Sequence, residues 1–249
     1  MFTAIKPHIM QDDYSETPSI SSEGKIPKLL YTKLSISQDS RPEVARRASH
    51  DLFECIEQSE NKRLTELQAR YVFAQIVDVV GYLDEHGITH GDIKDENVVI
   101  DKDLKVRWYE QVCTFERNGL IINGQVKLID FGSAIAVNPA EPRPFYRLFY
   151  GTAAYASSEI LLKKSYQAAP AEIWTLGVLL SYLLTGISPF PSLRYAVDGK
   201  VFLSEKVAGK ISDEAMDLMR RCLDPNPETR ATISQVQKHP WLQARCSTM

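Results

Sequence analysis

The stretch His90-Gly91-Asp92-Ile93-Lys94-Asp95-Glu96-Asn97 places a carboxylate, an ammonium group and an amide on one short loop. A second stretch follows downstream, where the apolar strand Val126-Lys127-Leu128-Ile129 leads into Asp130-Phe131-Gly132. Phosphoryl transfer needs little covalent help from a protein, but it needs cations and dipoles placed around the migrating group. The two stretches together predict a site for this chemistry.

Both stretches resemble signature motifs of protein kinases, and they occur in the order that kinases have. Residues 90–97 are similar to the catalytic loop His-Arg-Asp-x-x-x-x-Asn, and residues 130–132 are similar to the Asp-Phe-Gly turn. The residues of the two motifs most resemble those of the fungal PAS-kinase-like branch of the serine/threonine kinases. The resemblance covers about His50 to Leu242, and it implies an α+β, protein-kinase-like fold.

The resemblance divides the chain into a well-matched part and a weak part. Residues 50–243 are similar to the mainly helical C-terminal lobe of a kinase. Residues 1–49 contain Ser, Thr and Asp-rich tracts, so we interpret them as a truncated or degraded N-terminal lobe, or as a disordered segment. No Gly-x-Gly-x-x-Gly phosphate loop occurs in the sequence. Lys6 and Glu23 faintly resemble the lysine and glutamate that clamp the nucleotide, but a surface lysine and a loop glutamate are the favoured interpretation.

Residues 106–125 interrupt the kinase pattern where the family normally has a tight turn between two short strands. Joining Lys105 directly to Val126 restores an ordinary hairpin that leads into Asp130. Two interpretations stay open for this insertion. It is either an extended surface hairpin that turns at an Asn-Gly pair, or a retained intron translated in frame.

Three residues are carried over from the family as the catalytic group. The resemblance implies that Asp92 accepts the proton of the substrate hydroxyl and that Lys94 steadies the transferring phosphoryl group. Gly151-Thr152 resembles the turn on which the protein substrate docks, and the Thr152 hydroxyl is expected to link this turn to Asp92 and Lys94. The pairing of Lys94 with Thr152 indicates serine or threonine specificity.

The cofactors that the resemblance implies are ATP and Mg²⁺. Asn97 and Asp130 are the expected ligands of the metal ion, and Gly132 completes the cofactor-binding turn. An amide and a carboxylate supply oxygen ligands, which magnesium prefers.

Several neighbouring residues are expected to support the site. Glu159 is similar to the glutamate of the Ala-Pro-Glu motif, which forms a buried ion pair with an arginine near the end of the domain, and Arg230 matches that arginine. Glu172 stands where the family has an aspartate that holds the catalytic-loop backbone. Its extra methylene leaves the placement of that loop open.

Four further loop residues have expected roles outside the chemistry. Gly91 replaces the arginine that pairs with an activation-loop phosphate in many kinases, so control by that phosphate is not expected. His90 is expected to pack against Phe131 as a structural histidine. Asp95 and Glu96 are interpreted as solvated or backbone-bonding carboxylates.

Local patterns predict the helix that delivers the chain to this loop. Thr65 and Gln68 form a capping box, apolar residues then recur at helical spacing, and Gly87 is a natural stop. The catalytic loop is followed by Val98-Val99-Ile100, which we interpret as a short buried strand.

Composition limits the partners and the location of the protein. The net charge is −3 and the isoelectric point is about 6.0, so no nucleic-acid partner is expected. The most apolar run, Ile173 to Leu184, is too short and interrupted to span a bilayer, and no membrane partner is expected. Four scattered cysteines without metal or redox spacing indicate reduced thiols, which favours the cytoplasm, with the nucleus as a second location. The pattern leaves the oligomeric state open.

The sequence therefore supports two functions. The first is an ATP-dependent serine/threonine protein kinase that acts on protein substrates. The second is a pseudokinase or an orphan kinase lobe that binds partners without catalysis, because the glycine-rich loop and the nucleotide lysine are not evident.

Overall fold

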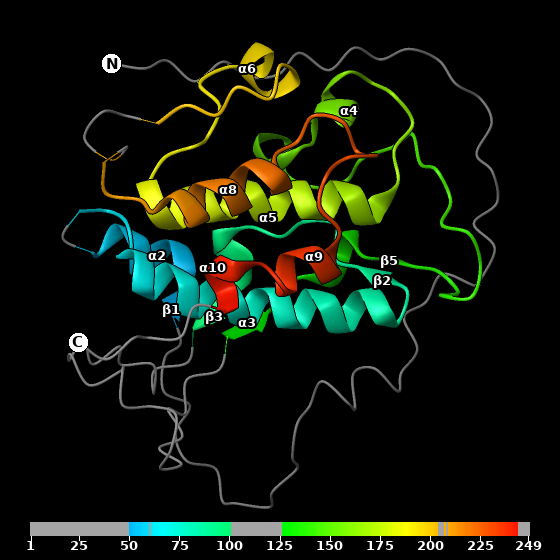
Figure 1. The fold of residues 1–249 in the computed structure, drawn as a ribbon. Helices are drawn as coiled ribbons and strands as arrows, with labels where there is room; N and C mark the ends of the chain where they lie inside the picture. The colour runs from blue at the N-terminus through cyan, green and yellow to red at the C-terminus, as the bar shows by residue number, and fades with distance from the viewer. Residues whose placement is uncertain (1–49, 60, 101–125, 204–206, 208, 244–249) are drawn as a thin grey trace, which may run out of the picture. The chain divides into compact units, whose positions relative to one another are not determined.

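The computed structural model describes residues 50–59, 61–100, 126–203, 207 and 209–243, which all belong to one compact unit, Ser37–Met249. Helices dominate this part of the chain (Figure 1). The helices are α2 (Leu52–Glu57), α3 (Glu66–Glu85), α4 (Ser158–Leu161), α5 (Ala168–Thr185), α6 (Leu193–Val197), α8 (Asp213–Cys222), α9 (Ile233–Gln237) and α10 (Pro240–Gln243). The strands are β1 (His50–Asp51), β2 (Ile88–Thr89), β3 (Val98–Ile100), β4 (Val126–Leu128) and β5 (Ile135–Ala136).

The strands form two small antiparallel sheets. One sheet has the order β1-β3-β4, with Val99 opposite Lys127 in the central pair. The other pairs β2 with β5, so that Thr89 lies opposite Ile135. The predicted strand at Val98–Ile100 is confirmed. The catalytic loop connects β2 to β3 and therefore joins the two sheets.

Helix α3 begins and ends where the sequence predicted. The Thr65 hydroxyl accepts a hydrogen bond from the amide of Gln68, and the Gln68 side chain accepts one from the amide of Thr65, which confirms the capping box. After the last helical residue, Gly87 takes a φ of +72°, a conformation that glycine adopts at little cost. The helix buries one stripe of apolar side chains, Val72, Phe73, Ile76, Val80 and Leu83.

Helix α5 forms the centre of the core, with α3 packed on one side and α8 on another (Figure 1). A side chain at Gly177 of α5 would lie 2.8 Å from atoms of Cys222 and Leu223, so glycine allows α8 to approach closely. By length and composition, α5 is the one helix of the described residues that could cross a membrane, but 83% of that window is buried inside the protein. We therefore interpret α5 as a core helix.

The predicted domain boundaries are not tested by this fold. The segment 1–49 and the insertion 106–125 lie outside the described residues, as do Lys6 and Glu23. Of the four cysteines, Cys55 is partly buried and Cys222 is buried, and both are free thiols.

Candidate active site

The catalytic loop brings Asp92, Lys94 and Asn97 into direct contact. The Lys94 Nζ atom lies 3.4 Å from the Asp92 Oδ2 atom. Asn97 donates through Nδ2 to the Asp92 carbonyl oxygen at 2.8 Å and to its Oδ2 atom at 3.2 Å. The turn Asp95–Asn97 is a 3₁₀ helix, which folds the chain back tightly enough for Asn97 to reach Asp92. The loop thus fixes the orientation of the Asp92 carboxylate.

The turn at Thr152 closes this cluster from a distant part of the chain. Its amide donates to the Asp92 Oδ1 atom at 2.7 Å, and its hydroxyl accepts a hydrogen bond from Lys94 at 2.9 Å. The predicted link therefore exists, although the bond to Asp92 runs through the backbone amide. Burial opposes ionisation of Asp92, but the hydrogen bonds from Thr152 and the charge of Lys94 outweigh it, so the pKa of Asp92 is lowered.

The charge of Lys94 is shared between two carboxylates. Its Nζ atom lies 3.2 Å from the Glu96 Oε2 atom as well as close to Asp92. Partial burial opposes the charged form, but the hydrogen bonds and charges of Glu96 and Asp92 raise the pKa of Lys94. Lys94 is therefore a fixed cation at neutral pH, and Glu96 is largely solvated, as predicted.

Asp130 occupies a left-handed backbone conformation, with φ of 61° and ψ of 73°. Its Oδ1 atom accepts a hydrogen bond from the amide of Gly132 at 3.2 Å, and its side chain is exposed. The preceding residue joins the two motifs, because the Ile129 amide donates to the Asn97 carbonyl oxygen at 3.0 Å. The structure thus brings the Asp130 turn to the catalytic loop by backbone pairing, with no direct bond between the Asp130 and Asn97 side chains.

His90 has the structural role that the sequence predicted. Its ring contacts Phe131 edge to face, with 4.6 Å between the ring centroids. Its Nε2 atom lies 3.0 Å from the Ile129 carbonyl oxygen. Burial lowers the pKa of His90, so the neutral ring holds the two motifs together at physiological pH.

Glu172 of α5 reaches the catalytic loop in spite of its extra methylene. The Gly91 amide donates to its Oε1 atom at 2.9 Å. Burial raises the pKa of Glu172 to about 7, against the hydrogen bonds from the backbone of Gly91 and His90. The expected anchoring of the loop by this helix is therefore present.

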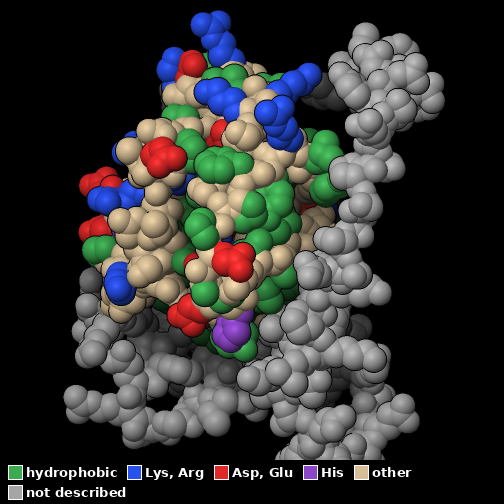
Figure 2. Space-filling model, turned by 90° about the vertical axis from the view of Figure 1, so that its right-hand side faces the viewer, with side chains coloured by type: hydrophobic (Ala, Val, Ile, Leu, Met, Phe, Trp, Pro, Cys, Tyr) green, Lys and Arg blue, Asp and Glu red, His purple; other side chains and the backbone are tan. Residues whose placement is uncertain are grey.

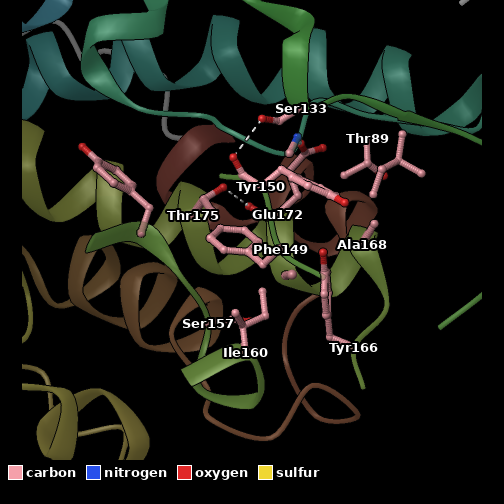
Figure 3. A pocket seen from close by; sticks show the side chains of 14 residues that line it. Thr89, Ser133, Phe149, Tyr150, Ser157, Ile160, Tyr166, Ala168, Glu172 and Thr175 are labelled. Carbon is pink, nitrogen blue, oxygen red and sulfur yellow. Dashed lines mark hydrogen bonds between the residues drawn. The ribbon is translucent and has the colours of Figure 1, made fainter. Parts of the chain in front are cut away.

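The segment from Asp130 to Glu159 corresponds to the activation segment of kinases, and it rests directly on Gly91. This residue has a φ of +81°, and a side chain there would lie 2.4 Å from the Ser133 carbonyl oxygen. The Ser133 hydroxyl donates to the Tyr150 carbonyl oxygen at 3.2 Å, as Figure 3 shows. Glycine is therefore needed at this position for two independent reasons.

The pocket in Figure 3 lies between Gly91, the activation segment and α5. Its volume is about 30 Å³, and its lining is mainly apolar, with Phe149, Tyr166 and Ile160 among the contributing residues. Ligand sites usually have volumes of about 300–1,000 Å³. This pocket is therefore too small for a nucleotide, and its lining does not include Asp92, Lys94 or Thr152.

Asp95 was predicted to be solvated or bonded to backbone; it is not solvated, but it does accept hydrogen bonds from the backbone of Asp95 and Glu96. The side chain is buried, and its Oδ1 atom accepts a hydrogen bond from the Tyr155 hydroxyl at 2.9 Å. Burial raises the pKa of Asp95, and the Tyr155 bond opposes that shift. Tyr155 in turn stacks on Tyr182 of α5, with 5.7 Å between ring centroids. The substrate turn is thus attached to the catalytic loop at a second point, which the sequence interpretation missed.

Comparison with known proteins places this geometry in a family. The model of the protein kinase domain matches residues 41–242. The chain belongs to the protein kinase family. The match begins nine residues before the region that the sequence resemblance covered, and it includes every predicted site residue.

Curated relatives are kinases, and several are named as serine/threonine-protein kinases. Serine/threonine-protein kinase PSK2 of Saccharomyces cerevisiae is 34% identical over 195 residues, which cover 78% of this chain and 15% of the relative. Sperm motility kinase 2B of Mus musculus is 32% identical over 185 residues, with 72% of this chain and 33% of the relative covered. CBL-interacting protein kinase 19 of Oryza sativa is 31% identical over 183 residues, with shares of 73% and 32%. The chain thus matches a third or less of the length of these relatives.

The ion pair that the sequence predicted for this kinase is present. Arg230 donates through Nη1 and Nη2 to the two oxygens of Glu159 at 2.9 and 2.7 Å. Its guanidinium group also lies over the ring of Trp174, 5.1 Å from the centroid. Burial opposes ionisation of Glu159, but the bonds and charge of Arg230 lower its pKa. This pair fixes the end of the activation segment to the loop between α8 and α9.

The donor set of the kinase site fits a magnesium ion. The amide nitrogen of Asn97 is bonded to Asp92, so its side-chain oxygen is the atom that would bind a cation. The exposed carboxylate of Asp130 is the second oxygen ligand. No group of three His, Cys, Asp or Glu side chains that could hold a metal occurs in the part of the chain that the structure describes. The phosphates of a nucleotide and water would therefore supply the remaining ligands.

Proposed function

We propose that this protein kinase transfers the γ-phosphoryl group of ATP to serine or threonine hydroxyls of a protein substrate. The observation that carries the proposal is the closed cluster in which the Thr152 amide binds Asp92 at 2.7 Å and the Thr152 hydroxyl binds Lys94 at 2.9 Å. Both bonds join the substrate turn to the two residues that act on the transferring group. An arrangement of this kind positions an acceptor hydroxyl next to a base.

The residues have distinct roles in this mechanism. Asp92 accepts the proton of the substrate hydroxyl, and its lowered pKa keeps it ionised and oriented at neutral pH. Lys94 places its positive charge beside the oxygen that attacks, which offsets charge on the phosphoryl group. Asn97 and Asp130 would hold Mg²⁺, which neutralises the phosphates when it is bound. Gly132 fixes the Asp130 carboxylate through its amide.

A binding function without catalysis is the second candidate, and one observation favours it. The sequence contains no Gly-x-Gly-x-x-Gly loop to cover the phosphates. The substrate turn and the ion pair of Glu159 with Arg230 do not depend on a nucleotide. Such a chain keeps a protein-binding surface even where ATP is not held. The buried or partly buried free thiols support the proposed cytoplasmic or nuclear location for either function.

Nucleotide binding separates the two candidates. The thermal midpoint of the full chain is measured with and without Mg²⁺ and ATP, and the variant Asp130→Asn serves as the control. A ligand at about 100 times its dissociation constant adds about 2.7 kcal/mol to the free energy of unfolding. A shift that is lost in the control, followed by phosphotransfer that Asp92→Asn abolishes, supports the kinase. A well-folded sample without a shift contradicts it and supports the binding function.

A further inference from the structure

The second half of the activation segment and the residues that directly follow it have an unusual balance of charge. The whole chain carries a net charge of −3, but between Pro142 and Pro170 every charged side chain that reaches solvent is positive. The single carboxylate of this range, Glu159, is buried against Arg230. A local excess of one sign on a protein of opposite net charge creates a potential that selects partners.

Three of these cations lie together and are unpaired within the described residues. Tyr146 and Tyr166 exchange backbone hydrogen bonds of 2.8 and 2.9 Å as an isolated antiparallel bridge. This pairing places Arg147 beside the stretch that holds Lys163 and Lys164. All three side chains are exposed, and none forms an ion pair with another residue that the structure describes.

The remaining cation of this range, Arg143, already has a partner. Its Nη2 atom lies 2.8 Å from the Asp84 Oδ1 atom and donates to the Asp84 carbonyl oxygen at 2.9 Å. The contact fastens the activation segment to the end of α3. Arg143 is therefore ion-paired within the protein, unlike the three cations that follow it.

Large apolar side chains are exposed among the unpaired cations. Leu148 is 69% exposed and Tyr150 is 75% exposed, and both lie between Arg147 and the substrate turn at Thr152. Figure 2 shows one face of the molecule, where hydrophobic side chains cover the middle and Lys and Arg side chains gather at one end. Contiguous apolar surface beside charge is typical of an interaction site.

We propose that Arg147, Leu148, Tyr150, Lys163 and Lys164, together called the Arg147 surface, bind a segment of the protein substrate that combines Asp or Glu with apolar residues. The proposal rests on the proposed function, because it makes the Arg147 surface an extension of the site at Thr152. Arg147 lies five positions before Thr152, whose amide binds Asp92, so a peptide whose hydroxyl lies at Asp92 can extend over these side chains. Carboxylates offset the three cations, and apolar residues cover Leu148 and Tyr150.

An acidic peptide matches the Arg147 surface better than a nucleic acid does. Nucleic-acid sites rely on many phosphate contacts and on a strongly basic domain, whereas this chain has an isoelectric point of about 6.0. A few cations with exposed Leu and Tyr side chains are instead typical of a rim and a core in a protein interface. Charges at such a rim act mainly on the association rate and on its salt dependence.

Binding of two peptides to the full chain tests the proposal without ATP or Mg²⁺. Both peptides carry one central Thr and the same apolar residues, and they differ only in having Asp or Lys at the other positions. Exposed ion pairs each change affinity by a factor of about 1.4 to 5. We expect the Asp peptide to bind at least about five times more tightly than the Lys peptide, and the difference to shrink as the salt concentration is raised. Fluorescence anisotropy measures both affinities.

The variant Lys163→Glu/Lys164→Glu should reverse this preference. The matched control is Lys210→Glu/Lys238→Glu, which changes the net charge equally at two exposed lysines outside the Arg147 surface. The control should keep the preference for the Asp peptide, and thermal midpoints of both variants should show that they fold. Equal binding of the two peptides, preference for the Lys peptide, or the same change in both variants would overturn the proposal. So would binding of phosphatidylserine vesicles through Lys163 and Lys164 without discrimination between peptides.

A phosphotransfer assay run in parallel keeps the two proposals apart. Charge-dependent peptide binding without phosphotransfer leaves the Arg147 surface in place and contradicts the proposed enzyme activity. Phosphotransfer with equal rates for the Asp and Lys peptides supports the enzyme and overturns the Arg147 surface.

Discussion

Removing either partner of the buried ion pair between Glu159 and Arg230 should destabilise the protein strongly. The side chains of Arg230 and Glu159 are 0% and 5% exposed, and they form paired hydrogen bonds of 2.7 and 2.9 Å. Arg230 also donates to the carbonyl oxygens of Asp224 at 2.9 Å and Pro170 at 2.8 Å. The substitution Glu159→Ala leaves the guanidinium charge buried without its carboxylate, so the loss exceeds that of a surface pair.

The expected cost follows from this burial. Breaking a buried ion pair from one side lowers the free energy of unfolding by about 3–5 kcal/mol. For a domain of this size, each kcal/mol lowers the thermal midpoint by about 2–4 °C, so the midpoint of Glu159→Ala should fall by about 6–20 °C. Urea unfolding followed by circular dichroism measures the free energy, and an unchanged denaturant slope shows that the comparison is valid.

Two controls make the reasoning refutable. The double variant Glu159→Leu/Arg230→Met removes both charges and should recover most of the loss, because apolar side chains of similar volume replace buried ion pairs at little cost. The pKa of Glu159 is lowered in the folded protein, so the stability it contributes is present above its ordinary pKa of 4.5 and disappears as the pH falls through the folded value. A loss below about 1 kcal/mol, typical of surface pairs, would refute the burial argument.

Three further predictions concern the catalytic loop. The pKa of Glu172 is raised from 4.5 to about 7 in the folded protein. The free energy of unfolding should therefore fall by up to about 3 kcal/mol as the pH rises from about 4.5 to above 7. Urea titrations at several pH values measure this fall, and Glu172→Gln should remove it. Tyr155→Phe leaves the buried Asp95 carboxylate without its hydroxyl partner and should cost about 1–3 kcal/mol; a neutral result in urea unfolding would show that Asp95 finds another partner. In Gly91→Ala, the new side chain would be strained by the positive φ and would clash with the activation segment at Ser133, so the free energy of unfolding should fall by about 1–3 kcal/mol. Thermal unfolding measures this loss, and unchanged stability would mean that the segment moves freely.

Local sequence patterns correctly predicted those helix ends and strands that are determined by residues close together in the sequence. The capping box at Thr65, the glycine stop after α3 and the short strand after the catalytic loop each depend on residues a few positions apart. The pair of Glu159 with Arg230 is a long-range contact, and it was predicted from motif resemblance rather than from spacing. The placement of Asp92, Lys94 and Thr152 came from the same source.

The features that the sequence left open depend on how distant elements pack. Asp95 was expected to be solvated or bonded to backbone, because carboxylates in loops are usually one or the other, and its side-chain partner Tyr155 lies 60 positions away. The extra methylene of Glu172 left the anchoring of the loop undecided, since its reach depends on where α5 lies against Gly91. The Arg147 surface arises only when the bridge of Tyr146 with Tyr166 brings two basic stretches together. No local pattern carries that information.

The activation segment is fastened at three points within ten residues, by Arg143 to Asp84, by Tyr146 to Tyr166 and by Thr152 to Asp92. A protease must draw the cleaved segment into an extended form, so the exposed side chain of Arg147 does not by itself make the peptide bond cleavable. Trypsin should cut after Arg147 only when neighbouring attachments have opened, and its rate then measures the population of that open form. The rate of limited digestion of the native protein thus measures how often its substrate turn is released, and the measurement needs neither nucleotide nor substrate.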